Sequence, residues 1–143
     1  MNKYLILILT ITFNWPAEKI FIACEGNFYE GNGSLWTISN DTVIEFPDNP
    51  IGDVVQSLLV FDNQLFAVVN GSGYIQVYNI SETGLTFFKQ IETVGSGPRE
   101  IAIYNSYLYF TNWNSANIKK LNLNTLEIDS EIAMPGLPED ILM

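Results

Sequence analysis

Short apolar runs separated by polar turns follow one another from residue 19 to the end of the chain. The turns are rich in Asn, Gly, Asp and Ser, which tolerate the backbone conformations of tight turns. Apolar positions never keep a spacing of about 3.6 residues over three turns, so no helix is expected. The pattern therefore predicts an all-β protein.

The expected strands fall into three groups. The first group lacks its first strand and has the ranges 19–24, 34–38 and 43–46. The second group is the best defined, with the ranges 54–61, 64–69, 74–80 and 85–94. The third group has the ranges 99–104, 107–111, 117–123 and 127–133. Several runs, such as 65–69, are apolar at every position, which is expected of a sheet packed between two others.

The second and third groups repeat each other. Residues 55–85 align with 98–128 without a gap, so that Leu65-Phe66 falls on Leu108-Tyr109. A period of about 40–45 residues built from strands is typical of a β-propeller, whose blades are four-stranded antiparallel sheets. The sequence predicts a partial propeller over 18–143. Its expected parts are about three blades, at approximately 18–50, 51–95 and 96–137, and the start of a further strand at 138–143.

The predicted ring is incomplete, because propellers close with roughly four to eight blades. An open arc exposes strand edges and apolar blade faces. We therefore expect either a fragment of a longer protein or a ring closed by self-association. A third alternative is that residues 139–143 fold back to complete the first blade.

Residues 1–17 follow the plan of a secretory signal peptide. Lys3 supplies a positive start, residues 4–13 carry no charge, and polar Asn14 ends the apolar run. That run is too short to span a bilayer as a helix. The alternative is an N-terminal core strand. The signal predicts export to the periplasm, cell surface or extracellular space, with no membrane span after processing.

Composition excludes several kinds of chemistry. A net charge of −10 disfavours nucleic acid as a partner. The chain has no histidine, which removes Ser-His-Asp catalysis and His-ligated zinc or haem. Cys24 is the one cysteine, so an internal disulfide is excluded, and we expect it to be a small buried hydrophobe. The sequence indicates no cofactor and no metal.

Charged residues stand near the starts of the expected first strands. They are Asp53, Arg99-Glu100 and Glu139-Asp140. Because they recur once per blade, we expect them to ring the mouth of the central channel. A cation or a polar ligand would suit such a ring. The other interpretation is that they are solvated turn residues.

Trp113 follows a predicted second strand, between Asn112 and Asn114. An aromatic ring flanked by amide donors suits a sugar or another flat polar ligand. Trp113 aligns with Asn70, so it is not part of the repeat, which favours a specific role. The alternative is packing between blades.

The tetrapeptide Tyr109-Phe110-Thr111-Asn112 resembles the motif of the YVTN family of β-propeller repeats. Gly95-Ser96-Gly97-Pro98 is similar to the Gly-x-x-Pro segment that leads into a blade of that family. The resemblance implies an exported or cell-surface propeller whose motif specifies structure, so it transfers no catalytic residue.

We therefore expect an exported, non-catalytic propeller module that binds a protein or a small polar ligand, or that has a role in a surface layer. The alternative is a fragment of a propeller enzyme, of a histidine-independent lyase or redox type. An acid–base enzyme needs two convergent carboxylates. Glu100 and Glu139 are the obvious pair.

Overall fold

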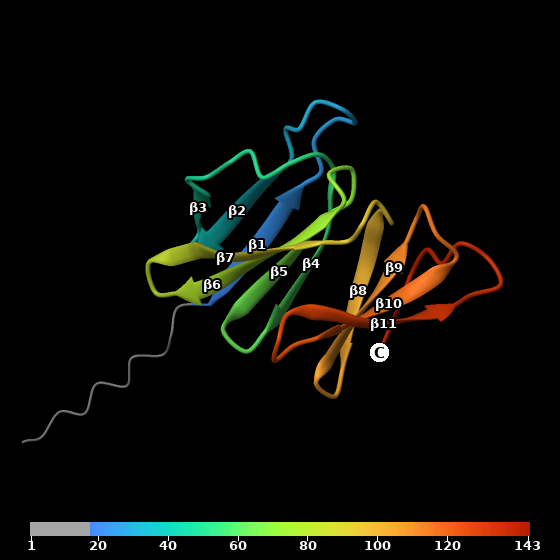
Figure 1. Ribbon diagram of the computed structural model, residues 1–143. Coiled ribbons are helices and arrows are strands. Elements are labelled where there is room, and N and C mark those ends of the chain that lie inside the picture. Colours follow the sequence, from blue (N-terminus) through green and yellow to red (C-terminus); the bar gives the residue numbers. More distant parts are fainter. Residues whose placement is uncertain (1–17) are drawn as a thin grey trace, which may run out of the picture.

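Figure 1 shows a computed structural model of the chain, which describes residues 18–143. The described residues form eleven strands and no helix. All pairings within the three sheets are between consecutive, antiparallel strands. The all-β prediction is confirmed. The predicted signal peptide, 1–17, lies outside the described residues.

The strands group as the sequence predicts, and their ends differ from the expected ones by at most two residues. The first sheet contains β1 (Lys19–Cys24), β2 (Ser34–Ser39) and β3 (Thr42–Glu45). The second contains β4 (Val55–Phe61), β5 (Gln64–Val69), β6 (Tyr74–Ser81) and β7 (Gly84–Glu92). The third contains β8 (Pro98–Tyr104), β9 (Tyr107–Asn112), β10 (Asn117–Asn122) and β11 (Glu127–Ala133).

The repeat extends to the turn geometry. Asp62 turns the chain between β4 and β5 with a φ of 52°, and Asn105 does the same between β8 and β9 with a φ of 55°. Asp and Asn adopt this left-handed conformation more readily than other non-glycine residues. The sharp turns place each strand directly beside the next.

The middle sheet is packed on both faces, and β5 contributes to each. Phe66 and Val68 belong to a core shared with the third sheet, where they meet side chains such as Phe110. The intervening residues Leu65, Ala67 and Val69 belong to a separate core shared with the first sheet. All five residues of this run are 0% exposed. Because successive side chains of β5 point to opposite faces of the sheet, this one strand contributes to two interfaces between blades.

The first strand of the middle sheet, β4, lies beside the first strand of each neighbouring sheet, since it contacts both β1 and β8. One buried polar contact adds to the apolar packing of the second and third sheets. The Asn70 side-chain amide donates a hydrogen bond of 2.8 Å to the carbonyl of Pro98. This bond joins the end of β5 to the start of β8.

Two further expectations concern the ends of the described chain. Cys24 is exposed, so the prediction of a buried cysteine was wrong. It is the last residue of β1, which is an edge strand of the first sheet. No strand follows β11 in the described residues, so the start of a strand at 138–143 stays a prediction. Residues 18–143 contain no helix that is long and apolar enough to cross a membrane.

Candidate functional site

One face of the molecule is formed by connecting loops, and we call it the loop face. Because neighbouring strands are antiparallel, the turn between the second and third strands of a blade emerges at the same end as the connection between blades. The loop face comprises residues 25–33, 46–54, 70–73, 93–97 and 113–116. The predicted site residues Asp53, Trp113 and Asn114 lie on it.

The loop 25–33 is held in a defined shape by its own polar side chains. The Asn32 side-chain oxygen accepts a hydrogen bond of 2.7 Å from the Asn27 backbone N–H. The Asn27 amide in turn donates to Glu30 at 2.8 Å. The Tyr29 N–H donates to the Asp53 carboxylate at 3.0 Å, which ties the loop to the chain before β4. Asp53 therefore anchors this loop.

Three aromatic side chains meet on the loop face, and we call them the aromatic patch: Phe28, Tyr29 and Trp113. The ring centroids of Phe28 and Trp113 are 6.4 Å apart, and those of Phe28 and Tyr29 are 6.3 Å apart. Phe28 is 51% exposed, Tyr29 96% and Trp113 39%. Since Phe28 comes from the first blade and Trp113 from the third, the loop 25–33 reaches past the middle blade.

Hydrogen bonds to the connection between β7 and β8 hold the Trp113 backbone in place. Its N–H donates a hydrogen bond of 2.7 Å to the Gly97 carbonyl. The Asn114 side chain donates to the Gly95 carbonyl at 3.1 Å. Gly97 has a φ of 62°, and a Cβ there would lie only 3.0 Å from the Asn114 amide nitrogen. Glycine allows this close approach without displacing the Asn114 side chain.

Arg99 joins the aromatic patch to the end of the described chain. Its Cζ atom lies 4.9 Å from the Trp113 ring centroid. One guanidinium nitrogen, Nη1, lies 3.1 Å from Oε2 of Glu139. The structure thus brings three of the predicted residues together: the cation Arg99, the aromatic ring of Trp113 and the anion Glu139.

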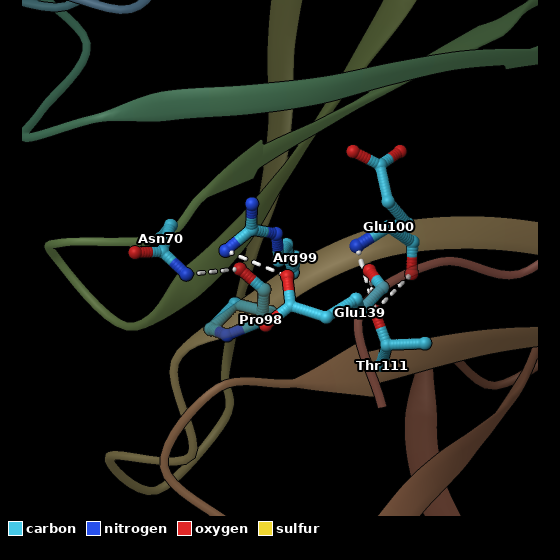
Figure 2. A network of polar contacts seen from close by, with 6 residues as sticks. All are labelled: Asn70, Pro98, Arg99, Glu100, Thr111 and Glu139. Carbon is cyan, nitrogen blue, oxygen red and sulfur yellow. Dashed lines mark hydrogen bonds and ion pairs between the residues drawn. The ribbon is translucent and has the colours of Figure 1, made fainter. Parts of the chain in front are cut away.

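The other predicted residues do not join this group. Figure 2 shows the Glu100 carboxylate pointing away from the ion pair of Arg99 and Glu139. The Glu100 N–H instead donates to Thr111 Oγ1 at 3.0 Å, and that hydroxyl lies 3.3 Å from the Glu139 carbonyl (Figure 2). Asp140 accepts a hydrogen bond of 2.7 Å from the N–H of Ile141. The expected pair of convergent carboxylates is therefore not formed.

Asn112 is turned into the third blade, in contrast to the expectation that it would stand beside Trp113 as a donor to a ligand. Its side chain is 0% exposed. The amide donates to the Asn117 carbonyl at 3.0 Å and to the Asn117 side-chain oxygen at 2.9 Å. This residue supports the turn that carries Trp113.

Sequence reasoning missed Phe28 and Tyr29, the two most exposed rings of the aromatic patch. They lie in a loop outside the repeat, so the alignment of blades gives them no counterpart. Within residues 18–143 no group of three or more His, Cys, Asp or Glu side chains is placed to hold a metal ion.

Known structures with the same arrangement of sheets are β-propellers. A chain of the nidogen/laminin complex matches with 18% identity and a TM-score of 0.62, covering 80% of this chain and 43% of that one. The WD40 β-propeller domain of Doa1 matches with 19% identity and a TM-score of 0.61, covering 81% and 41%. The three sheets are blades of a β-propeller. Streptogramin B lyase matches with 18% identity and a TM-score of 0.54, covering 82% and 46%.

At sequence identities this low, the similarity to these structures shows only that the fold is shared. The chain spans less than half the length of each of these three propellers. No protein-family model matches the sequence, and no curated protein matches it.

Proposed function

We propose that this propeller module is a binding protein and that the aromatic patch is its contact surface. The observation that carries the proposal is the meeting of Phe28, Tyr29 and Trp113 in solvent, from loops of two different blades. Exposed aromatic rings on ordered loops offer large apolar area with little conformational entropy to lose. Tyr and Trp are among the side chains that most often dominate binding energy at protein interfaces.

The shape of the patch favours a partner protein over a small molecule. Tyr29 is almost fully exposed and projects from the loop, so that it can enter a recess on another surface. Arg99 and Glu139 lie at the rim, where charged groups contribute to orientation and to the rate of association. A sugar stacked on the rings is the small-ligand version of the same proposal.

The same geometry argues against an acid–base enzyme at this face. Glu139 is paired with Arg99, and Glu100 points elsewhere (Figure 2). The 143 residues also contain no histidine. The proposal therefore assigns binding, and no catalytic step, to the loop face.

Two variants test the proposal. The full chain with Phe28 and Tyr29 both changed to Ser removes the projecting part of the patch. Phe88→Ser is the matched control, since Phe88 on β7 is 52% exposed and lies outside the patch. The wild type and the variants would be immobilised and exposed to a cell-envelope fraction and to a glycan array. We expect specific capture by the wild type and the control, and its loss in the double variant. Equal capture by all three would contradict the proposal.

We also propose that the protein is exported and is a member of the YVTN group of propellers. The support is the apolar N-terminal run after Lys3 and the residues 109–112 on β9. Mass measurement of the protein from the extracellular or envelope fraction should show that about the first 17–20 residues are missing. A cytoplasmic protein that retains Met1 would contradict export.

A third part of the proposal concerns closure of the ring. Among the described residues, β1 is the edge of a three-stranded sheet and has no strand on its outer side. An unpaired edge is a template for a further strand. We propose that further chain or a second copy supplies it. Light scattering on the 143-residue chain tests the second copy, and a stable monomer would contradict it.

A further inference from the structure

Arg99 shows how one cation is held at the aromatic patch. Its guanidinium lies over the Trp113 ring, with Cζ 4.9 Å from the centroid, and Nη1 lies 3.1 Å from Oε2 of Glu139. An arginine can make both contacts at once, because its planar guanidinium stacks on aromatic rings while its N–H groups pair with carboxylates. The patch therefore contains one complete set of ring, guanidinium and carboxylate.

The loop 25–33 presents another ring and carboxylate without a cation. Tyr29 and Glu30 are adjacent in sequence, and both are exposed. The side-chain amides of Asn27 and Asn32 donate hydrogen bonds of 2.8 Å and 3.0 Å to Glu30, and both bonds go to the same oxygen, Oε2. Glu30 forms no ion pair with any residue that the structure describes. Its carboxylate is thus held in place, and its second oxygen is open to a partner.

The backbone holds Tyr29 in an exposed position. Its φ is 66°, in the left-handed region that few residues other than glycine, asparagine and aspartate adopt. The hydrogen bond of 3.0 Å from its N–H to the Asp53 carboxylate stabilises this conformation. Since the residue is 96% exposed, both faces of its ring are open to solvent. A strained backbone that presents an open ring is typical of a contact site.

The cations of the described chain are already engaged elsewhere. Every lysine and arginine side chain of residues 18–143 contacts a carbonyl, a carboxylate or an aromatic ring of the chain itself: Lys19, Lys89, Arg99, Lys119 and Lys120. The sequence has 16 Asp and Glu residues, and within residues 18–143 only two ion pairs form. A positively charged partner is therefore electrostatically complementary to this protein.

An exposed ring next to a fixed carboxylate favours arginine over other cations. A lysine ammonium acts as a point charge, whereas a guanidinium both stacks on a ring and pairs with a carboxylate, as Arg99 does within the chain. We propose that the partner of the aromatic patch is a protein segment rich in arginine, whose guanidinium groups contact the Tyr29 ring and the Glu30 carboxylate. This inference rests on the proposed function of the patch and names the chemistry of its partner.

Three short labelled peptides separate charge from shape. One alternates arginine with glycine, the second has lysine in place of arginine, and the third has citrulline, the neutral isostere of arginine. Fluorescence anisotropy with the full chain at about 150 mM salt limits non-specific attraction. We expect saturable binding of the arginine peptide, binding of the lysine peptide about three- to tenfold weaker, and none of the citrulline peptide. Equal binding of the arginine peptide and either of the others, or no saturable binding at about 1 mM protein, would overturn the proposal.

Glu30→Gln and Glu131→Gln form a matched pair of variants. Glu131 on β11 is also exposed and accepts a hydrogen bond of 2.9 Å from an asparagine amide, that of Asn117, but it lies outside the loop face. Glutamine keeps a side-chain oxygen that accepts such bonds, so the loop 25–33 should keep its shape. Glu30→Gln should weaken binding of the arginine peptide about three- to tenfold, and Glu131→Gln should leave it unchanged. Equal effects would indicate general attraction to an acidic chain and would overturn the assignment.

The double variant with Phe28 and Tyr29 changed to Ser separates this inference from the proposed function. It should lose binding of the arginine peptide together with the capture described above. Patch-dependent capture of a partner, without binding of the arginine peptide by the wild type, would overturn the arginine-rich partner and leave the binding function standing. Arginine-peptide binding that the double variant retains would place that binding elsewhere and overturn the inference. Failure of both capture and peptide binding to depend on the two rings would contradict the inference and the proposed function together.

Discussion

The guanidinium of Arg99 lies over the indole ring of Trp113, 4.9 Å from its centroid, while it also pairs with Glu139. Arg99 begins the third blade, Trp113 follows its second strand, and Glu139 lies beyond its last strand. One side chain thus connects three parts of the chain that are separate in sequence. The three charged and aromatic groups form a common surface because of this contact.

Arg99→Leu should lower the free energy of unfolding by less than about 1 kcal/mol, because cation–π contacts and ion pairs at the surface contribute little. The emission of Trp113 should change, since the cation leaves its ring. Urea unfolding followed by tryptophan fluorescence measures both effects. A loss of several kcal/mol would show that Arg99 stabilises the core and is not confined to the surface.

Asn70→Ala should be more damaging, although it removes only one hydrogen bond. Asn70 is 6% exposed, and its amide satisfies the Pro98 carbonyl at 2.8 Å. An unsatisfied buried polar group costs about 1–3 kcal/mol. Gln64→Ala is the control, because the bond from Gln64 to Asn79 is exposed. Equal unfolding free energies of the two variants in urea would contradict this prediction.

Leu65→Val and Phe66→Leu test the two interfaces of the middle blade. The two side chains are adjacent in sequence but belong to different cores. Their costs should therefore add to within about 0.5 kcal/mol in the double variant, as for independent sites. Chemical unfolding of the two single variants and the double variant gives the coupling energy. A coupling above about 1 kcal/mol would mean that the two cores repack together.

Tyr78 should make the stability of the protein fall at alkaline pH. Burial raises the pKa of its hydroxyl above the ordinary value of 10.0. The unfolded chain then loses this proton at a lower pH than the folded protein, so stability is intact below about pH 10 and is lost above it. Between about pH 9 and pH 11, the unfolding free energy should fall more steeply for the wild type than for Tyr78→Phe. Parallel pH profiles would contradict the effect.

Gly52→Ala should destabilise the junction between the first and second blades. Gly52 has a φ of 137°, and a Cβ there would lie 2.7 Å from a methyl carbon of Val69. Its carbonyl also accepts a hydrogen bond of 2.8 Å from Gly33. Gly136→Ala is the control, since a Cβ at Gly136 meets no atom within 4 Å. Thermal unfolding should show a lower midpoint for Gly52→Ala alone.

The strands could be predicted from sequence because each depends on local information. The run from Leu65 to Val69 is apolar throughout, and Asp62 and Asn105 mark equivalent turns. The spacing of the repeat and the residue types in its turns together predict where each blade begins and ends. The same reasoning failed for Cys24, because exposure at the end of an edge strand depends on what lies beside it in space.

The candidate sites were predicted only in part. Trp113 stood out because it interrupts the repeat, and Arg99 and Glu139 because they lie near the starts of expected first strands. Phe28 approaches Trp113 through the folding of a long loop, which no spacing in the sequence encodes. Phe46 and Tyr78 likewise come from different blades and pack edge to face in one core only after the sheets meet. Contacts of this kind depend on tertiary structure.

The alternation along β5 also determines where the chain tolerates a change in length. Inserting one residue within β5 would send Leu65 and Phe66 to the opposite interfaces and disturb both cores together. An added residue beside Phe28 and Tyr29, at the tip of the loop 25–33, shifts no strand register and changes the surface that carries these two rings. New binding specificities can therefore arise by lengthening the loops, while the length of the middle strands stays fixed.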